Sequence, residues 1–404
     1  MLNISTPNTA RVDDVIAIRA SGLDPARLAT LGVRTRVDDQ EWQSVGLFAP
    51  DEDGAIDPAR SPSLGGTYLG RSGMGLFWSQ TCTTGPAVFP ATAQTVSSTV
   101  TLRQSEDVLV REVARSALTA RCGARPVQER GLVGTLFHPR ARVGRPVLVL
   151  GGSEGGQNDL AAALLASHGY AALALTYFGA DGLPGQLHDV PIGYFRTALD
   201  WLVSQPESHG RRAAIYGNSK GGEAALLTAS LTETVAAVAA MVPSGVLLPA
   251  HGNLPAWRDR SGGLPPQTHT LRAVPAESGD ARVLRAAYSS AGSTDPDHPA
   301  AIPVERIGGP VLIAAASDDC VWPSSLALVA SERLRRAARD HADTFVELRG
   351  AGHLVQPPYL PTTPQLVPYG TGWMLLGGNP RANARAAVRA WRATLRLLRH
   401  AWDE

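Results

Sequence analysis

The sequence is poor in lysine, in cysteine and in long apolar runs, and each shortage excludes a class of protein. Lys220 is the only lysine among the 37 lysines and arginines, a bias that together with abundant Ala, Gly and Pro is typical of GC-rich coding. Cys82, Cys122 and Cys320 are far apart and form no CxxC pair, which excludes a disulfide framework and a cysteine-ligated zinc site. No apolar stretch is long enough to cross a bilayer, and the N-terminus lacks the features of a secretory signal. We therefore expect a soluble, cytoplasmic protein.

The charge is almost balanced, with a formal net charge of +1. Such a balance gives no reason to expect a nucleic acid or an anionic membrane as partner. A chain of 404 residues with 44% hydrophobic and 18% charged residues is typical of a globular protein with room for two domains. No pattern of residues indicates a metal or a redox cofactor.

Residues 1–125 form short alternating apolar runs between clusters of Gly, Pro, Asp and Ser. This pattern predicts a small all-β domain, an antiparallel sandwich of immunoglobulin-like type. The strands expected in it are Val15–Arg19, Val33–Val37, Gly75–Trp78 and Val96–Leu102.

Residues 126–404 alternate fully apolar strands with helical segments, which predicts a doubly wound α/β domain whose mostly parallel sheet is buried on both faces. The expected strands are Val147–Leu150, Ala171–Leu175, Ala213–Tyr216, Val235–Met241, Pro310–Ala315 and Thr344–Leu348. The expected helices are Leu160–Leu165, Tyr194–Val203, Glu223–Ser230 and Pro380–Trp402. A Pro- and Gly-rich stretch at about 246–303, with one helical piece near Ala281–Ala287, is long enough to serve as a lid.

Two Gly-x-Ser-x-Gly motifs, centred on Ser153 and Ser219, each follow a predicted strand and precede a predicted helix. In an α/β-hydrolase the loop after an early central strand lends a backbone N–H to the oxyanion hole, and the nucleophile follows two strand–helix units later. This order favours Ser219 as the nucleophile. Ser153 and Glu154 then belong to the oxyanion loop, and Ser153 could equally cap the next helix.

A serine nucleophile needs a base and an acid that orients it, in the chain order Ser, Asp, His. His353, between Gly352 and Leu354 after the last strand, is the strongest candidate base. The acid is Asp319 or Asp318, and Asp319 is favoured because it lies four residues before a proline. The remaining aspartate would cap the turn.

Other candidates have simpler interpretations. Cys320 lacks a base of its own and is better interpreted as a packing residue. His168, before Gly169, is better interpreted as a cation at a helix C-terminus.

Taken with these residues, the chain resembles the acyl-CoA thioesterase / bile acid-CoA:amino acid N-acyltransferase family over almost all of its length. The segments that carry the resemblance are Ser63–Tyr68, Gly73–Trp78, Gly217–Glu223, Ile302–Arg306, Asp318–Trp322, Gly352–Tyr359 and Gly377–Ala382. The sequence departs from the familiar animal members at 151–156 and 246–303. The resemblance implies Ser219 as nucleophile, His353 as base and Asp319 as acid.

The mechanism expected from these residues is thioester hydrolysis through an acyl-enzyme. The oxyanion would be held by the backbone N–H of Lys220 and one from Ser153 or Glu154. The Lys220 side chain is expected either in solvent or at the pocket mouth, facing a phosphate of CoA or of a carrier arm. Two alternatives remain: acyl transfer to an amine or alcohol, as in bacterial natural-product biosynthesis, and a non-catalytic binding protein of the same fold.

Overall fold

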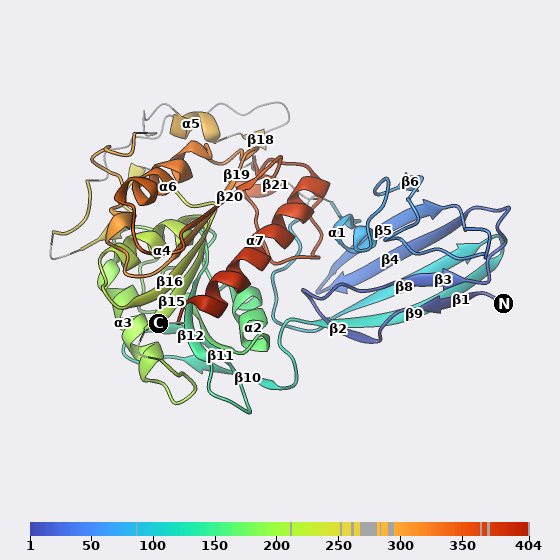
Figure 1. Cartoon of the computed structure of the whole chain (residues 1–404), viewed down its shortest axis with the longest axis horizontal. Helices are drawn as coiled ribbons and strands as arrows, with labels where there is room; N and C mark the ends of the chain where they lie inside the picture. The colour runs from blue at the N-terminus through green and yellow to red at the C-terminus, as the bar shows by residue number, and fades with distance from the viewer. Residues whose placement is uncertain are drawn as a thin grey trace.

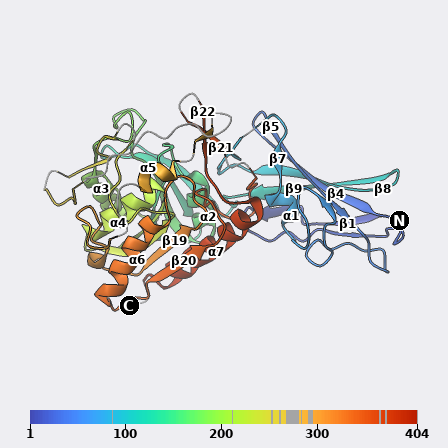
Figure 2. The same cartoon turned by 90° about the horizontal axis from the view of Figure 1, so that it is seen from above.

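The computed structural model describes residues 1–85, 87–210, 212–250, 253–259, 262–266, 281–282, 284–289, 295–363, 366–369 and 372–402. Two regions lie side by side along the long axis of the molecule: an all-β region that contains the N-terminus, and an α/β region (Figure 1). The view from above shows the same arrangement, with the helix α7 (Pro380–His400) reaching toward the all-β region (Figure 2). In the part of the chain described here, no helix is both long and apolar enough to span a membrane.

The all-β region consists of one large sheet and a two-stranded ribbon. The large sheet has the order β2 (Thr9–Arg11), β9 (Asp107–Ser116), β8 (Val96–Gln104), β4 (Ala29–Val37), β5 (Gln40–Phe48) and β6 (Gly65–Gly66), and β7 (Thr81–Cys82) also pairs with β5. The ribbon joins β1 (Asn3–Ser5) to β3 (Arg19–Ser21). Burial alternates along β4 and β8, which confirms the strands expected at Val33–Val37 and Val96–Leu102.

Two of the strands expected in this region are wrong. The segment Gly75–Trp78 is the helical turn α1, and all four of its residues are buried. The expected strand Val15–Arg19 is irregular up to Ile18, and β3 begins only at Arg19. A short apolar run has the same appearance in a buried turn and in a buried strand, because it contains too few residues to show a period.

The α/β region is built on an eight-stranded sheet. Its order is β10 (Cys122–Val127), β11 (Val133–Pro139), β13 (Tyr170–Thr176), β12 (Arg145–Leu150), β15 (Ala213–Asn218), β16 (Val235–Met241), β19 (Val311–Ala316) and β20 (Thr344–Leu348). β11 pairs antiparallel with both of its neighbours, and the strands from β13 to β20 run parallel. All six strands expected in this region are present.

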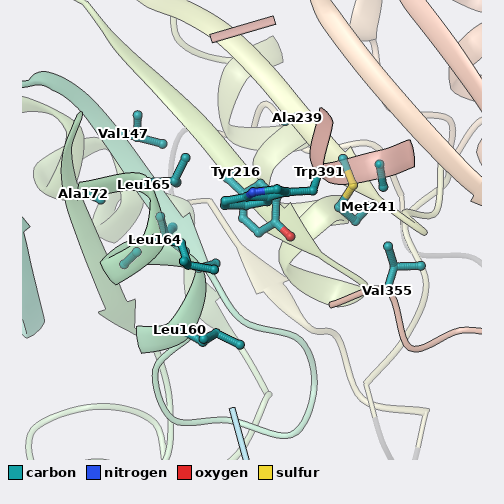
Figure 3. Close-up of a cluster of buried hydrophobic side chains, with 14 of the residues drawn as sticks. Val147, Leu160, Leu164, Leu165, Ala172, Tyr216, Ala239, Met241, Val355 and Trp391 are labelled. Atoms are coloured by element: carbon teal, nitrogen blue, oxygen red, sulfur yellow. The ribbon is translucent and has the colours of Figure 1, made fainter. Parts of the chain in front are cut away.

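Helices cover both faces of this sheet. α2 (Asp159–Ser167) and α7 pack on one face, and α3 (Ile192–Ser204), α4 (Lys220–Ser230) and α6 (Ser325–Ala337) pack on the other. Alternate side chains of each strand enter the two cores, so that Val147 and Leu148 of β12 belong to opposite ones. Figure 3 shows the first core, where Trp391 of α7 lies over Tyr216 of β15.

The stretch 246–303 is described only in part. β17 (Trp257–Arg258) pairs with β14 (Val190–Pro191), and β18 (Ala281–Arg282) joins β22 (Gly372–Leu375) and β21 (Leu366–Tyr369). The helix expected at Ala281–Ala287 begins later than predicted, because α5 spans Arg285–Ser289 and its expected start is β18. A short 3₁₀ turn, η2 (Val304–Arg306), follows the stretch. Residues 267–280, in the middle of the expected lid, lie outside the described residues.

Buried polar contacts join the two regions. Asp13 accepts a hydrogen bond from Nε1 of Trp391 (2.8 Å), and its Oδ2 lies 2.5 Å from Nε2 of His168, the residue that ends α2. Arg115 of β9 donates from Nη1 to the carbonyl of Tyr359 (2.8 Å). These contacts hold the all-β region against α2, α7 and the loop after β20. They also give His168 a carboxylate partner, in addition to its expected position at a helix C-terminus.

Candidate active site

Ser219 stands on a strained turn between β15 and α4. Its backbone has φ 55° and ψ −120°, a conformation that a residue with a side chain seldom adopts. The glycines on either side are required by space: a Cβ on Gly217 would lie 2.1 Å from the carbonyl oxygen of Gly221, and one on Gly221 would lie 2.1 Å from that of Gly151. The turn therefore projects the hydroxyl of Ser219 from the carboxyl edge of the sheet, as a nucleophile elbow does.

The structure brings Ser219, His353 and Asp319 together in one chain of hydrogen bonds. Oγ of Ser219 lies 2.7 Å from Nε2 of His353, and Nδ1 of His353 lies 2.7 Å from Oδ2 of Asp319. The three residues are 7%, 8% and 2% exposed, so water is largely excluded from these bonds. His353 can therefore take a proton from the serine while the carboxylate orients its ring.

Asp319, and not Asp318, is the aspartate that reaches His353. Oδ1 of Asp319 also accepts the backbone N–H groups of Val321 (2.8 Å) and Trp322 (3.1 Å). Asp318 is exposed and accepts the N–H of Gly378 at 3.2 Å. The expectation that the other aspartate caps the turn was wrong, because Asp319 performs both tasks with its two oxygens.

The imidazole of His353 is held from several sides. Its ring meets the ring of Trp322 edge to face at a centroid distance of 4.8 Å, and its backbone N–H donates to the carbonyl of Leu376 (2.7 Å). Further along the same loop, the Tyr359 carbonyl receives the buried Arg115 guanidinium, whose pKa burial lowers to about 10. Contacts from three separate segments therefore position the loop that carries the histidine.

The loop after β12 approaches Ser219 at Gly152, where a Cβ would lie 3.2 Å from the Cβ of Ser219. The buried hydroxyl of Tyr177 contacts the carbonyls of Gly151 (2.8 Å) and Gly152 (3.0 Å). Since the C=O and N–H of a trans peptide point in opposite directions, the N–H groups of Gly152 and Ser153 face away from Tyr177. Oε1 of Glu154 accepts the Gly152 N–H at 3.0 Å.

Ser153 is exposed and does not cap the following helix. The N-cap of α2 is Asn158, whose side chain accepts the N–H of Ala161. The capping interpretation of Ser153 was therefore wrong, because the helix starts five residues later than that interpretation requires. Lys220 is the first residue of α4, a position where backbone N–H groups have no partner within the helix and attract anions.

Both expectations for the Lys220 side chain were wrong. The side chain is neither in solvent nor at a pocket mouth, because the residue is 3% exposed. Its Nζ lies 2.8 Å from Oε1 of Glu223, donates to the carbonyl of Leu248 (2.6 Å) and lies 5.6 Å from the centroid of the Trp257 ring. Nε1 of Trp257 donates to the same Glu223 oxygen at 2.7 Å. Burial lowers the pKa of Lys220 and raises the pKa of Glu223.

Breaking this buried pair should destabilise the protein strongly. Lys220→Met leaves the Glu223 carboxylate unpaired in the core, and we expect a loss of about 3–5 kcal/mol in the free energy of unfolding, measured by urea denaturation. The double variant Lys220→Met/Glu223→Gln removes both charges and should recover most of that loss. A single variant within about 1 kcal/mol of the wild type would contradict the prediction.

Sequence reasoning missed the residues that support the site from outside its motifs. Tyr177 and Arg115 belong to no motif, and their partners are 25 or more residues away. Glu223 ends the elbow segment, but its partner Trp257 is 34 residues away. Only the tyrosine left a signal, since it directly follows a buried strand at the carboxyl edge of the sheet. In the described part of the chain, no group of three or more His, Cys, Asp or Glu residues could hold a metal ion. Cys320 is buried and packs near Gly377.

The strand order of the sheet and the elbow between β15 and α4 are those of an α/β hydrolase. Residues 13–129 match the family model of the acyl-CoA thioester hydrolase/BAAT N-terminal region, and residues 190–403 match that of the BAAT / acyl-CoA thioester hydrolase C terminal. The chain belongs to this family, which confirms the resemblance noted from its motifs.

Known relatives extend over almost the whole chain. Acyl-coenzyme A amino acid N-acyltransferase 2 from Rattus norvegicus is 30% identical, with 98% of this chain and 97% of the relative covered. Acyl-coenzyme A thioesterase 1 from Homo sapiens is 31% identical, with 94% and 91% covered. Among solved structures, a putative dienelactone hydrolase from Klebsiella pneumoniae matches 68% of this chain and 97% of its own, with 16% identity and a TM-score of 0.41.

Proposed function

We propose that this protein is a serine-dependent acyl-thioester hydrolase that works through an acyl-enzyme. The observation that carries the proposal is the buried Ser219–His353–Asp319 chain, with 2.7 Å at both of its links. The names of the relatives support an acyl-CoA substrate, because they are acyl-CoA thioesterases and acyl-CoA N-acyltransferases. An acyl group on a carrier protein offers the same thioester bond.

In the first step His353 takes the hydroxyl proton while Ser219 Oγ attacks the thioester carbonyl. The oxyanion accepts hydrogen bonds from the backbone N–H of Lys220 and from that of Ser153. The Ser153 N–H points away from Tyr177, because the Tyr177 hydroxyl donates to the carbonyl of the same peptide group. Glu154 takes part through its carboxylate, which occupies the neighbouring Gly152 N–H. The thiolate leaves with the proton from His353. A water molecule deprotonated by His353 then attacks the acyl-enzyme carbonyl, the bond to Ser219 Oγ breaks, and Oγ takes the proton back from His353 as the acid leaves.

The proposal also covers the two domains, the cellular location and the stretch 246–303. Residues 1–125 form an immunoglobulin-like sandwich domain and residues 126–404 form the catalytic domain, in a cytoplasmic protein. The chain passes between the two large sheets after Ser116 and before Cys122, so β10 belongs to the catalytic domain and the boundary lies a few residues before 125. The described residues Leu248 and Trp257 bind the Lys220–Glu223 pair beside the elbow, which supports the proposal that this part of the stretch 246–303 covers the acyl group.

Acyl transfer to an amine or alcohol is the second candidate, and the N-acyltransferase relatives favour it. The test combines the enzyme with acyl-CoA thioesters of short, medium and long chains, alone and with amino acids or alcohols. Free thiol and product mass are measured together. Hydrolysis predicts thiol release without any acceptor and a free acid as product. Product that forms only with an acceptor present would replace the hydrolase proposal with the transferase.

A further inference from the structure

A cleft lies away from the Ser219 elbow, where α7 and the edge strand β20 meet the α1 segment of the all-β region. Figures 1 and 2 both show the N-terminal half of α7 beside α1. The cleft has a volume of about 810 Å³, within the range of small-molecule sites. It is lined by six arginines and by no carboxylate; the arginines are Arg71, Arg381, Arg385, Arg389, Arg392 and Arg396.

Five of these arginines form one stripe along α7. They recur at intervals of four, four, three and four residues, so that they share a face of the helix, while Trp391 and Leu398 bury the opposite face in the core. The 21 residues of α7 contain no Asp or Glu, although the whole chain has 36 of them. Codon bias explains why these residues are arginine rather than lysine, but it does not explain the missing acids.

The row of arginines along α7 lowers the stability of the protein when no ligand is bound. Like charges three and four residues apart repel along a helix, and cations in the first turn, such as Arg381, oppose the helix dipole. Within the described part of the chain, none of the six arginines forms an ion pair. The three carboxylates adjacent in sequence to lining residues are engaged elsewhere, Asp14 with Arg11, Asp343 with Arg339 and Glu347 with Arg349.

Apolar and aromatic side chains complete the cleft. Val15 and Phe345 are 63% and 38% exposed, and Trp78 and Tyr359 also line the walls. Arginine binds phosphate with several N–H donors at once, and aromatic faces stack on planar rings. A ligand that satisfies both features carries phosphate groups and a planar base.

We propose that this cleft binds the phosphates and base of an adenosine-diphosphate-like group. That group can be a free nucleotide, or it can be the nucleotide end of CoA. The assignment to CoA rests on the proposed thioester chemistry, whereas the binding of an adenosine-diphosphate-like group to this cleft does not. Tyr359 links the two places, since it lines the cleft and belongs to the loop that carries His353.

The test is a titration of the full chain with ADP and with CoA, at low and at high salt. Arg385 and Arg396 are the residues to change, because both are exposed and neither has a hydrogen-bond or ion-pair partner among the described residues. Arg385→Gln/Arg396→Gln should weaken ADP binding by about tenfold or more and leave the melting temperature unchanged or higher. Arg103→Gln/Arg399→Gln removes the same charge outside the cleft and should keep the affinity within about twofold.

Kinetics with two substrates distinguish the sources of the group. If CoA is the ligand, the double variant raises KM for an acyl-CoA but leaves KM unchanged for the same acyl group on pantetheine. If the ligand is a free nucleotide, both KM values stay unchanged while ADP affinity falls. The proposal is overturned if ADP and CoA fail to bind at low salt, or if the two double variants weaken binding equally. Binding of only anionic vesicles or an acidic carrier protein would overturn it as well.

Discussion

Ser219→Ala should lower kcat for acyl-thioester hydrolysis by about 10⁴- to 10⁶-fold. The alanine keeps the elbow backbone and removes only Oγ, which lies 2.7 Å from Nε2 of His353. The melting temperature should change little, since the substitution removes one hydroxyl and its hydrogen bond to His353. Release of free thiol from an acyl-CoA measures the rate, and a fluorophosphonate probe reports whether an activated serine is present.

Ser153→Ala is the matched control, because Ser153 stands in the second Gly-x-Ser-x-Gly motif of the same chain. Its proposed contribution is a backbone N–H, which alanine retains, so its rate should stay within about tenfold of the wild type. Equal losses in the two variants would refute the assignment. Failure of the wild type to react with the probe, under conditions where other serine hydrolases do, would favour a non-catalytic binding protein.

Asp319→Asn should reduce kcat by about 10⁴-fold while the fold is preserved. An amide group can replace the oxygen that faces Nδ1 of His353, and the ring then takes the wrong tautomer for accepting the serine proton. The other side-chain oxygen can still accept the N–H groups of Val321 and Trp322, so the turn should keep its shape. The rate is followed by thiol release, and circular dichroism checks the structure.

The neighbouring Asp318→Asn is the control for the same chemical change one residue away. Its carboxylate is exposed and accepts only the N–H of Gly378 among the contacts described for its side chain. We expect less than about a threefold change in kcat, because an exposed hydrogen bond contributes little. A larger effect at Asp318 than at Asp319 would show that Asp318, and not Asp319, is the acid that orients His353.

Much of the α/β region could be predicted because its strands are apolar throughout. Val235–Met241 was predicted with the bounds that the structure shows, since a continuous apolar run between polar ends has one natural length. The all-β region was harder to predict. Gly75–Trp78 is a buried helical turn instead of a strand, and four apolar residues carry no period that could separate the two.

In the candidate site, too, the residues that belong to motifs could be predicted, whereas their surroundings could not. Ser219, Asp319 and His353 follow strands whose order along the chain implies that they meet at one edge of the sheet. The burial of Lys220 had no such signal. Its partners include a glutamate one helical turn away and Trp257 of the distant strand β17, and only the folded chain shows that both face the same space.

Net charge was also a poor guide to local charge. A value of +1 gave no reason to expect a nucleic acid or an anionic membrane as partner, yet folding places Arg71 beside the arginine stripe of α7 and leaves the acids elsewhere. A sum over the chain contains no information about which charges become neighbours. The spacing of the arginines along α7 is visible in the sequence, but the position of Arg71 and of the apolar walls beside them depends on the tertiary structure.

The sequence by itself determined the parallel sheet, the elbow and the residues that meet there, because periodicity, glycine spacing and strand order are properties of the chain in one dimension. The tertiary structure decided which aspartate reaches His353, where the lone lysine lies and how the arginines gather. Each of these depends on distances between segments far apart in sequence. The physical reason is that burial and charge pairing act through space, and local propensity does not encode them.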